Sequence, residues 1–218
     1  MCFSESISLL IGVCGLLSSA YFYIYLMNIY ASIGIGYFAL MEIIQFFQYR
    51  VINQCKNPYN QFLTILGYLH ICFQPVFVNL WLFAFISTAP NFTFIYLSLF
   101  AGILLASRIF FVKDEELCDG LNEPLCGKRT CAISGKRHIA WQVRLRAAGK
   151  YWFTPSIGLH FFMWVIPTLT LVQLKPLLAL LLTGPYMGFL LTKNIHEQPA
   201  IWCYTSIAQM FVTFFLLK

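Results

Sequence analysis

The chain has 218 residues and a formal net charge of +6, and 60% of its residues are hydrophobic while 10% are charged. Soluble domains carry about 25% charged residues, so this composition excludes an ordinary water-soluble fold. The positive charge does not require a nucleic-acid partner, because a basic face beside anionic lipid headgroups is typical of membrane proteins. We therefore expect the lipid bilayer, and no nucleic acid, as the main partner of the chain.

Seven continuous apolar segments follow one another along the sequence. A helix of about 20 apolar residues spans the hydrocarbon core of a bilayer, and lipid offers the backbone no hydrogen-bond partner outside a helix or a closed barrel. Because the runs are continuous rather than alternating, the sequence predicts an all-α integral membrane bundle of about seven transmembrane helices in one domain, residues 1–218. The expected spans are 6–27, 32–48, 62–86, 92–111, 154–173, 176–192 and 200–217.

Lysine and arginine gather on one predicted face of this bundle. Of the 14 basic residues, 12 lie in the connections 49–61, 112–153 and 193–199 or, like Arg108, at an adjoining span end. The other two are Lys175 and Lys218. Loops rich in Lys and Arg usually stay in the cytosol. We therefore expect a multi-pass protein with its N-terminus in the cytosol and its C-terminus on the opposite side.

The polar connection 112–153 is long enough to fold by itself. In the stretch HIAWQVRLR, apolar residues alternate with polar or small ones, and this period of two is typical of a strand. The longer stretch RTCAISGKRHIAW has the spacing of a hairpin around Gly135. The sequence predicts a short β-hairpin against the basic face, with an amphipathic segment in the membrane interface as the alternative. The residues expected on its apolar face are Ile139, Trp141, Val143 and Leu145.

Several ionisable and amide side chains lie inside the predicted spans. Charged residues in the bilayer core are costly and usually face the interior of the bundle. Counted from the basic face at 1.5 Å per residue, Glu42, His70 and His160 all lie roughly 10–13 Å deep. We therefore expect one shared polar pocket that opens towards the basic face and is lined by Glu42, Gln45, His70, Gln74 and His160.

The chemistry of this pocket has several readings. A carboxylate and two imidazoles form the ligand set of a catalytic zinc or iron site, so Glu42, His70 and His160 are candidate ligands for zinc or another divalent metal. The same groups could relay protons, and two histidines could hold a haem, which is the weaker fit. A hydrogen-bonded network that only locks the packing of the helices is the structural alternative.

Four of the eight cysteines form a second cluster in loops on the basic face. They could bind zinc, with His138 as a further ligand, in a reducing compartment, or form two disulfides in an oxidising one. The absence of a C-x-x-C pattern weakens the zinc reading, whereas the charge asymmetry places this face in the cytosol. On the sequence alone we give the charge asymmetry more weight. The four cysteines are Cys55, Cys118, Cys126 and Cys131.

Five short stretches carry a resemblance to a known family. The stretches MEIIQFFQY, INQC, LGYLHICFQPVFVN, GKRHIAW and LHFFMWVIP occur in this order between residues 35 and 170. In them the chain resembles a family of uncharacterised small multi-pass membrane proteins found in microbes and large DNA viruses. The resemblance implies a membrane location and supplies no activity.

Three functions are compatible with these observations. The first is an intramembrane metal-dependent hydrolase acting on a small lipid-like substrate, in which the metal activates a water molecule. The second is a small transporter or channel in which Glu42 carries a proton or a cation. The third is a non-catalytic membrane protein whose polar network is structural and whose loop binds a partner. The fold class does not decide among them.

Overall fold

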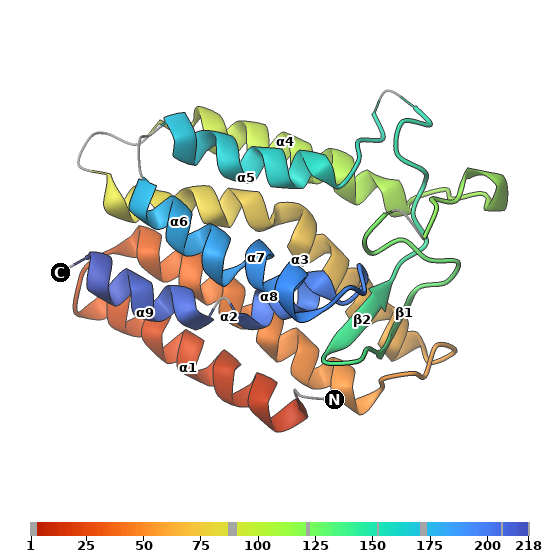
Figure 1. Cartoon of the computed structure of the whole chain (residues 1–218), viewed down its shortest axis with the longest axis horizontal. Coiled ribbons are helices and arrows are strands. Elements are labelled where there is room, and N and C mark those ends of the chain that lie inside the picture. Colours follow the sequence, from red (N-terminus) through yellow and green to blue (C-terminus); the bar gives the residue numbers. More distant parts are fainter. Residues whose placement is uncertain are drawn as a thin grey trace.

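The computed structural model describes residues 4–86, 91–120, 123–151, 153–170, 174–205 and 207–217. The chain is mostly helical, and its longer helices run side by side along the long axis of the molecule (Figure 1). A small two-stranded sheet and its flanking loops cover one end of the bundle, at the right of Figure 1. We call this covering structure, residues 112–153, the cap.

Four helices form the first half of the chain. They are α1 (Glu5–Ile24), α2 (Ile29–Arg50), α3 (Pro58–Leu82) and α4 (Thr93–Ala106), and the short 3-10 turns Phe83–Phe85 and Ser107–Ile109 extend the last two. Side-chain oxygens of Ser4, Asn28 and Asn57 accept hydrogen bonds from the first turns of α1, α2 and α3. These caps satisfy N–H groups that have no partner within a helix, and they explain where each helix begins.

The second half of the chain forms shorter helices. They are α5 (Gly158–Thr170), α6 (Leu174–Thr183), α7 (Pro185–Leu191), α8 (Gln198–Thr205) and α9 (Ile207–Leu216). Gly184 and Pro185 separate α6 from α7, because proline lacks the N–H that a continuous helix would use. The expected end of the fifth span at residue 173 lies outside the described residues, as does Lys218.

The apolar segments are helical, but only some helices have the length of a membrane span. In the described part of the chain, four segments are long and apolar enough to cross a bilayer: Glu5–Ile24, Ile29–Arg50, Pro58–Phe85 and Leu174–Leu191. The apolar segments Thr93–Ile109 and Gly158–Pro167 are shorter. A helical protein with apolar segments of membrane-spanning length is therefore shown, and the seven-span topology stays a prediction.

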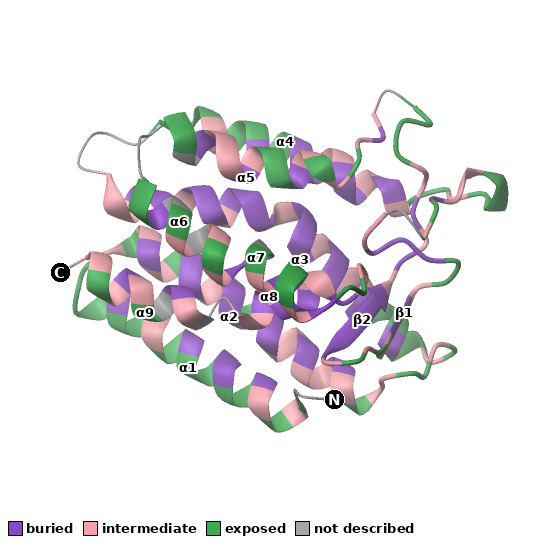
Figure 2. Cartoon of the chain, in the orientation of Figure 1, coloured by how far each residue is buried: buried purple, intermediate pink, exposed green. Residues whose placement is uncertain are grey.

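The outer surface of the bundle is unusually apolar. Large hydrophobic side chains are exposed on α1, α4 and α9, among them Leu17, Phe100 and Phe215 at 67%, 58% and 78% exposure. Figure 2 shows exposed residues along the outer sides of α1 and α4. Polar side chains including Glu42 and Gln45 are buried instead. Large exposed apolar surfaces in proteins mark contact with another molecule or with a membrane, and here they cover the sides of the helices.

The predicted β-hairpin is confirmed. Strands β1 (Cys131–Ser134) and β2 (Ile139–Gln142) pair antiparallel, with Cys131 opposite Gln142 and Ser134 opposite Ile139. The apolar residues at positions 139, 141, 143 and 145 are each at most 1% exposed, as the alternation predicts, but His138 and Ala140 on the other face are buried as well.

Two amide side chains attach the hairpin to the ends of α2 and α3. Asn60 of α3 donates from Nδ2 to the carbonyl oxygen of Ala132 (3.0 Å) and accepts from the N–H of Ala132 at Oδ1 (2.9 Å). Gln48 of α2 accepts a hydrogen bond from Nε1 of Trp141 (2.9 Å) and donates to the carbonyl oxygen of Leu63 (2.9 Å). Asn60 thus pairs with β1 much as a neighbouring strand would.

Glu197 holds the turn of the hairpin from the loop between α7 and α8. Its Oε1 accepts hydrogen bonds from the backbone N–H groups of Arg137 and His138, and its Oε2 accepts one from the Thr192 hydroxyl at 2.8 Å. A Cβ atom at position 135 would lie 2.7 Å from Glu197 Oε1. Gly135 is therefore required for the close approach of the carboxylate to the turn.

The four loop cysteines form two disulfides. Cys55 pairs with Cys131, which joins the loop after α2 to β1, and Cys118 pairs with Cys126 within the cap. The structure thus takes the disulfide alternative rather than the zinc site, and Nδ1 of His138 shares a hydrogen bond with the Tyr49 hydroxyl. Disulfides are typical of oxidising compartments, so they oppose the orientation that the charge asymmetry favours.

The disulfides predict which cysteines react with alkylating reagents. In denaturant without reductant, we expect a maleimide to leave the four loop cysteines unmodified, because their sulfurs are covalently paired. Mass spectrometry after reduction and a second label would then find the second label on all four. Maleimide on these cysteines in freshly prepared membranes would contradict the disulfides.

The Glu197 contact predicts a stability change in the cap. Glu197→Gln leaves buried N–H groups with a weaker acceptor, and we expect it to lower the free energy of unfolding by about 1–3 kcal/mol. For a chain of this size each kcal/mol lowers the thermal midpoint by about 2–4 °C, which can be measured on detergent-purified protein. Glu115→Gln, at an exposed glutamate of the same cap, is the control and should leave the midpoint unchanged.

Candidate functional site

All five residues of the predicted polar pocket are buried, but they divide among three places. Their exposures run from 0% for Gln45 to 7% for His70. One place joins α2 to α3, a second joins α3 to α5, and a third lies between α1 and α2. The structure brings together Gln74 with His160, and it separates both from Glu42.

His70 forms a reciprocal contact with Tyr37 of α2. Nε2 of His70 donates to the Tyr37 carbonyl oxygen at 2.7 Å, and the Tyr37 hydroxyl donates to the His70 carbonyl oxygen at 2.6 Å. The two rings stack with their centroids 3.8 Å apart, and Tyr37 also stacks on Phe77. His70 therefore ties α2 to α3, which is the role of the structural alternative.

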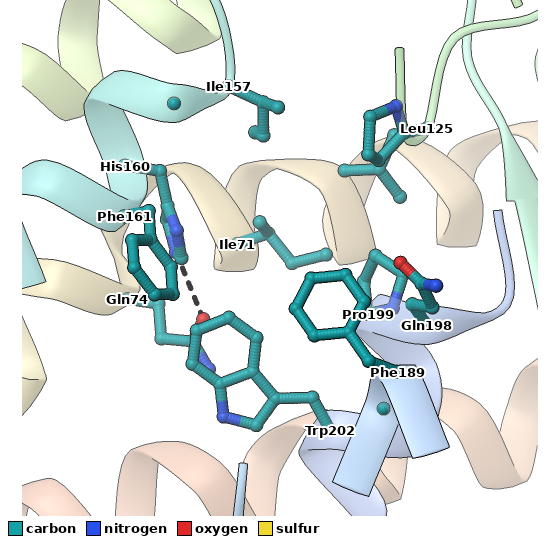
Figure 3. Close-up of a pocket in the computed structure, with 13 residues that line it drawn as sticks. Ile71, Gln74, Leu125, Ile157, His160, Phe161, Phe189, Gln198, Pro199 and Trp202 are labelled. Carbon is teal, nitrogen blue, oxygen red and sulfur yellow. Dashed lines mark hydrogen bonds between the residues drawn. The ribbon is translucent and has the colours of Figure 1, made fainter. Parts of the chain in front are cut away.

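Gln74 and His160 meet at the wall of an apolar cavity. Nε2 of His160 on α5 lies 3.0 Å from Oε1 of Gln74 on α3, drawn as the dashed line in Figure 3. With the amide oriented this way the imidazole donates and the amide oxygen accepts. The indole of Trp202 on α8 packs edge-on against the His160 ring, with centroids 5.7 Å apart.

The cavity extends from this pair towards the cap. It has a volume of about 230 Å³ and lies between α3, α5, α7 and the start of α8, with two residues of the cap at its far end. In Figure 3, His160, Phe161 and Gln74 lie at one end, and Leu125, Gln198 and Pro199 lie at the other. The remaining lining is mostly apolar and comprises Ile71, Pro124, Ile157, Gly158, Gly188, Phe189 and Trp202.

Glu42 lies on another side of α2, near Ser8 of α1 and also near Cys203 and Tyr204 of α8, and Gln45 lies one turn further along α2. Glu42 is 1% exposed and neither of its carboxylate oxygens has a hydrogen-bond partner among the described residues. The hydroxyl of Ser8 on α1 lies near enough to interact with this carboxyl, although neither group reaches hydrogen-bond geometry. Both polar atoms of the Gln45 amide are buried and likewise unpaired.

The predicted metal ligands do not converge. Within the described part of the chain, no three His, Cys, Asp or Glu side chains lie close enough together to hold a metal ion. The Nε2 atoms of His70 and His160 are both occupied by hydrogen bonds to α2 and α3. The arrangement therefore assembles neither the three-ligand metal site nor a pair of histidines facing a common haem.

Sequence reasoning missed part of the cavity wall and one contact of Glu42. Trp202 and Leu125 are apolar residues in apolar surroundings, so nothing in the sequence separates them from ordinary core. Ser8 is one of several small polar residues in its segment. Arg108, which the sequence places at a span end on the basic face, is fully buried and donates to the Glu123 carboxylate and to the Arg146 carbonyl oxygen.

The fold and the cavity together define the class of protein to which this chain belongs. The chain is a helical protein with segments of membrane-spanning length, a disulfide-linked cap and an internal apolar cavity with one polar pair on its wall. Over residues 6–217 it matches the family of unknown function DUF5765, and it belongs to that family. No curated protein and no solved structure matches the chain.

Burial of His138 makes the cap sensitive to acid. Its ring is fully buried beside Tyr49 and Tyr204, and Nδ1 accepts from the Tyr49 hydroxyl at 2.8 Å. Removal from water disfavours the charged imidazolium and lowers the pKa of His138 to about 3. Between that value and the ordinary pKa of about 6.5, the unfolded chain is protonated at this residue while the folded chain is not.

Stability should therefore fall as the pH falls below about 6.5, by up to ~1.4 kcal/mol per pH unit from this group alone. His138→Phe keeps an aromatic ring at this position and removes the titratable imidazole. The thermal midpoint of this variant should therefore decline less steeply between pH 7 and pH 5 than that of the original chain. The comparison uses the difference between the two pH profiles, because the variant also loses the bond to Tyr49. If the thermal midpoints of the two proteins fall equally steeply with decreasing pH, His138 does not contribute to the acid sensitivity of the cap.

Proposed function

We propose that this chain is an integral membrane protein of seven membrane segments that binds a small lipid-like molecule in the cavity between α3, α5, α7 and α8. The observation that carries the proposal is the cavity itself, a largely apolar space of about 230 Å³ with a polar pair on its wall. Ligand sites in proteins are typically apolar clefts with a few placed polar groups. This cavity has that composition.

The size of the cavity limits the ligand. Pockets for drug-sized molecules have volumes of about 300–1,000 Å³, and this one is somewhat smaller. A single hydrocarbon chain, or the end of a lipid, is a better match than a whole two-chain lipid. Phe189, one of the lining residues, is 66% exposed on the side of the bundle, so a chain could enter from the surrounding lipid.

The polar pair suggests how one end of the ligand is recognised. Among the described residues, Nε2 of Gln74 has no hydrogen-bond partner, although Gln74 is 1% exposed and lines the cavity. A buried donor without a partner costs about 1–3 kcal/mol, and an oxygen on the ligand would remove that cost. We therefore propose a ligand with a carbonyl, ester or hydroxyl oxygen at one end. His160 orients the Gln74 amide by holding its oxygen.

The disulfides bear on the orientation in the membrane. We propose that the cap and the N-terminus face an oxidising compartment, with the C-terminus on the opposite side. One disulfide within the cap and one that joins the cap to the loop after α2 support this orientation, whereas the excess of basic residues on the same face favours the reverse one.

Hydrolysis by a bound metal gains no support from the arrangement of Glu42, His70 and His160. The described residues around the cavity include one imidazole and two amides, those of Gln74 and Gln198, and no carboxylate lines it. A role in ion movement is favoured by a separate observation, the unpaired Glu42 between α1 and α2.

A bulky side chain in the cavity should prevent binding. Ile157 lines the cavity and is partly exposed, so Ile157→Trp fills the space with little disturbance of the core. We expect lipid extraction and mass spectrometry of the detergent-purified chain to find about one apolar molecule per protein, and to find at least about tenfold less with Ile157→Trp. The tenfold figure corresponds to about 1.4 kcal/mol.

Ile103→Trp is the matched control, because Ile103 is 52% exposed on α4 and does not line the cavity. It should retain the same molecule at the same ratio as the original chain. Equal amounts of bound lipid in all three proteins, or none in any of them, would refute the proposed function.

A further inference from the structure

We propose that Ser8, Glu42 and Gln45 form a binding site for a sodium ion between α1 and α2. None of these residues lines the apolar cavity, so the site is independent of the proposed lipid-like ligand. The inference rests on the number of unpaired polar atoms, on the register of the two helices and on the chemistry of the donor atoms.

Five polar atoms of these three side chains have no hydrogen-bond partner among the described residues. They are Oγ of Ser8, Oε1 and Oε2 of Glu42, and Oε1 and Nε2 of Gln45. All three residues are at most 1% exposed. Buried polar groups in folded proteins nearly always have a partner, so this concentration on two neighbouring helices indicates a missing polar occupant.

The register of α1 against α2 places Ser8 at about the level of the turn that carries Glu42 and Gln45. A Cβ atom at Gly12 would meet the Ile43 side chain and the Ala39 carbonyl oxygen, and the Glu5 carboxylate forms an ion pair with Arg50 (2.7 Å). Ser8 lies between these two contacts and is therefore opposite the turn that carries Glu42 and Gln45. Those two residues are three apart and share a face of α2.

Other titratable groups near Glu42 are neutral or acidic. Its carboxyl interacts electrostatically with Tyr49 of its own helix and with Cys203 and Tyr204 of α8, and with Ser8 of α1. Among the described residues, no lysine, arginine or histidine forms an ion pair with it. An ionised Glu42 would therefore be a buried charge without a counter-charge, which is costly in a protein interior.

The donor atoms determine the class of the ion. Carboxylate, hydroxyl and amide oxygens are hard ligands, which suit alkali and alkaline-earth cations better than zinc or copper. One carboxylate balances one positive charge, whereas a divalent ion would leave a buried excess of +1. The site therefore favours a monovalent ion, and a pocket of side-chain oxygens suits dehydrated Na⁺.

The site lies close to the surface of the cap end. Ser8 is one turn inside the start of α1 at Glu5, and Glu42 is eight residues before the end of α2 at Arg50, or about 12 Å at 1.5 Å per residue. The Glu5–Arg50 ion pair joins the two helices at that end, and both side chains are about half exposed. An ion therefore has a short path from the aqueous phase.

The first test is the thermal midpoint of the full chain in detergent, measured against NaCl at constant ionic strength with N-methyl-D-glucamine chloride as the replacement salt. A ligand that binds only the folded protein raises the midpoint in a saturable way. We expect such a rise with Na⁺, weaker with decreasing pH because protons compete for the carboxylate. Binding of radioactive Na⁺ should saturate at about one ion per chain.

Three variants connect the response to the site. We expect Glu42→Gln to lower the Na⁺ affinity at least ~100-fold, since it removes the charged ligand, and Ser8→Ala to lower it about tenfold, since it removes one neutral ligand. Glu115→Gln, at an exposed glutamate of the cap, is the control and should keep the original affinity.

The outcomes separate a cation site from its alternatives. The absence of a saturable Na⁺ response in the original chain would overturn the proposal and leave a carboxyl that holds only a proton or a water molecule. An unchanged response in Glu42→Gln would also overturn it. If that variant does not fold, Ser8→Ala and Gln45→Leu decide, because unaltered Na⁺ affinity in both contradicts a site built from these side chains.

Discussion

The docking of the β-hairpin onto the ends of α2, α3 and α8 is the contact on which the rest of the structure depends. A hairpin of two four-residue strands is at best marginally stable alone. Here its open edges are closed from outside the sheet, since Asn60 pairs with both backbone groups of Ala132 and the His196 carbonyl oxygen accepts from the N–H of Trp141. Helix ends and cap therefore position one another. The hairpin also supports the cavity wall, because the N–H of Val143, just after β2, donates to the carbonyl oxygen of Leu125, and Leu125 lines the cavity together with Pro199 of α8.

The fold was predictable where a single periodicity decides the structure. Alternation over nine residues was enough to find β2, although the strand covers only Ile139–Gln142 and is buried on both faces, and continuous apolar runs were enough to find α1, α2 and α3. Prediction was weaker in the last third, where the sequence showed one apolar run from 176 to 192 and the chain forms α6 and α7 with a break at Gly184. A continuous apolar run indicates only that the segment is removed from water. It does not report whether proline and glycine within it interrupt the helix.

The candidate site shows the same limit more sharply. Depth along a helix follows from counting residues, and Glu42, His70 and His160 were expected together on that basis. The direction in which a side chain points depends also on the rotation of each helix about its axis, which counting does not give. Even His70 and Gln74, four residues apart, differ by about 40° around the helix, and this is enough for one to face Tyr37 of α2 and the other His160 of α5.

Three arginines at the cap end of the molecule also have a structural role. This role weakens their value as a signal of how the protein is oriented in the membrane. Arg50, Arg108 and Arg144 form ion pairs with Glu5, Glu123 and Asp114 on the same face. Arg108 is buried, and its guanidinium also holds the Arg146 carbonyl oxygen, so this cation is part of the core of the cap. The positive-inside rule describes basic residues that stay in short loops during insertion. A cap of about 40 residues is within the loop length to which that rule applies. The ion pairs therefore do not reverse the rule by themselves, and the two disulfides are the observation that opposes it.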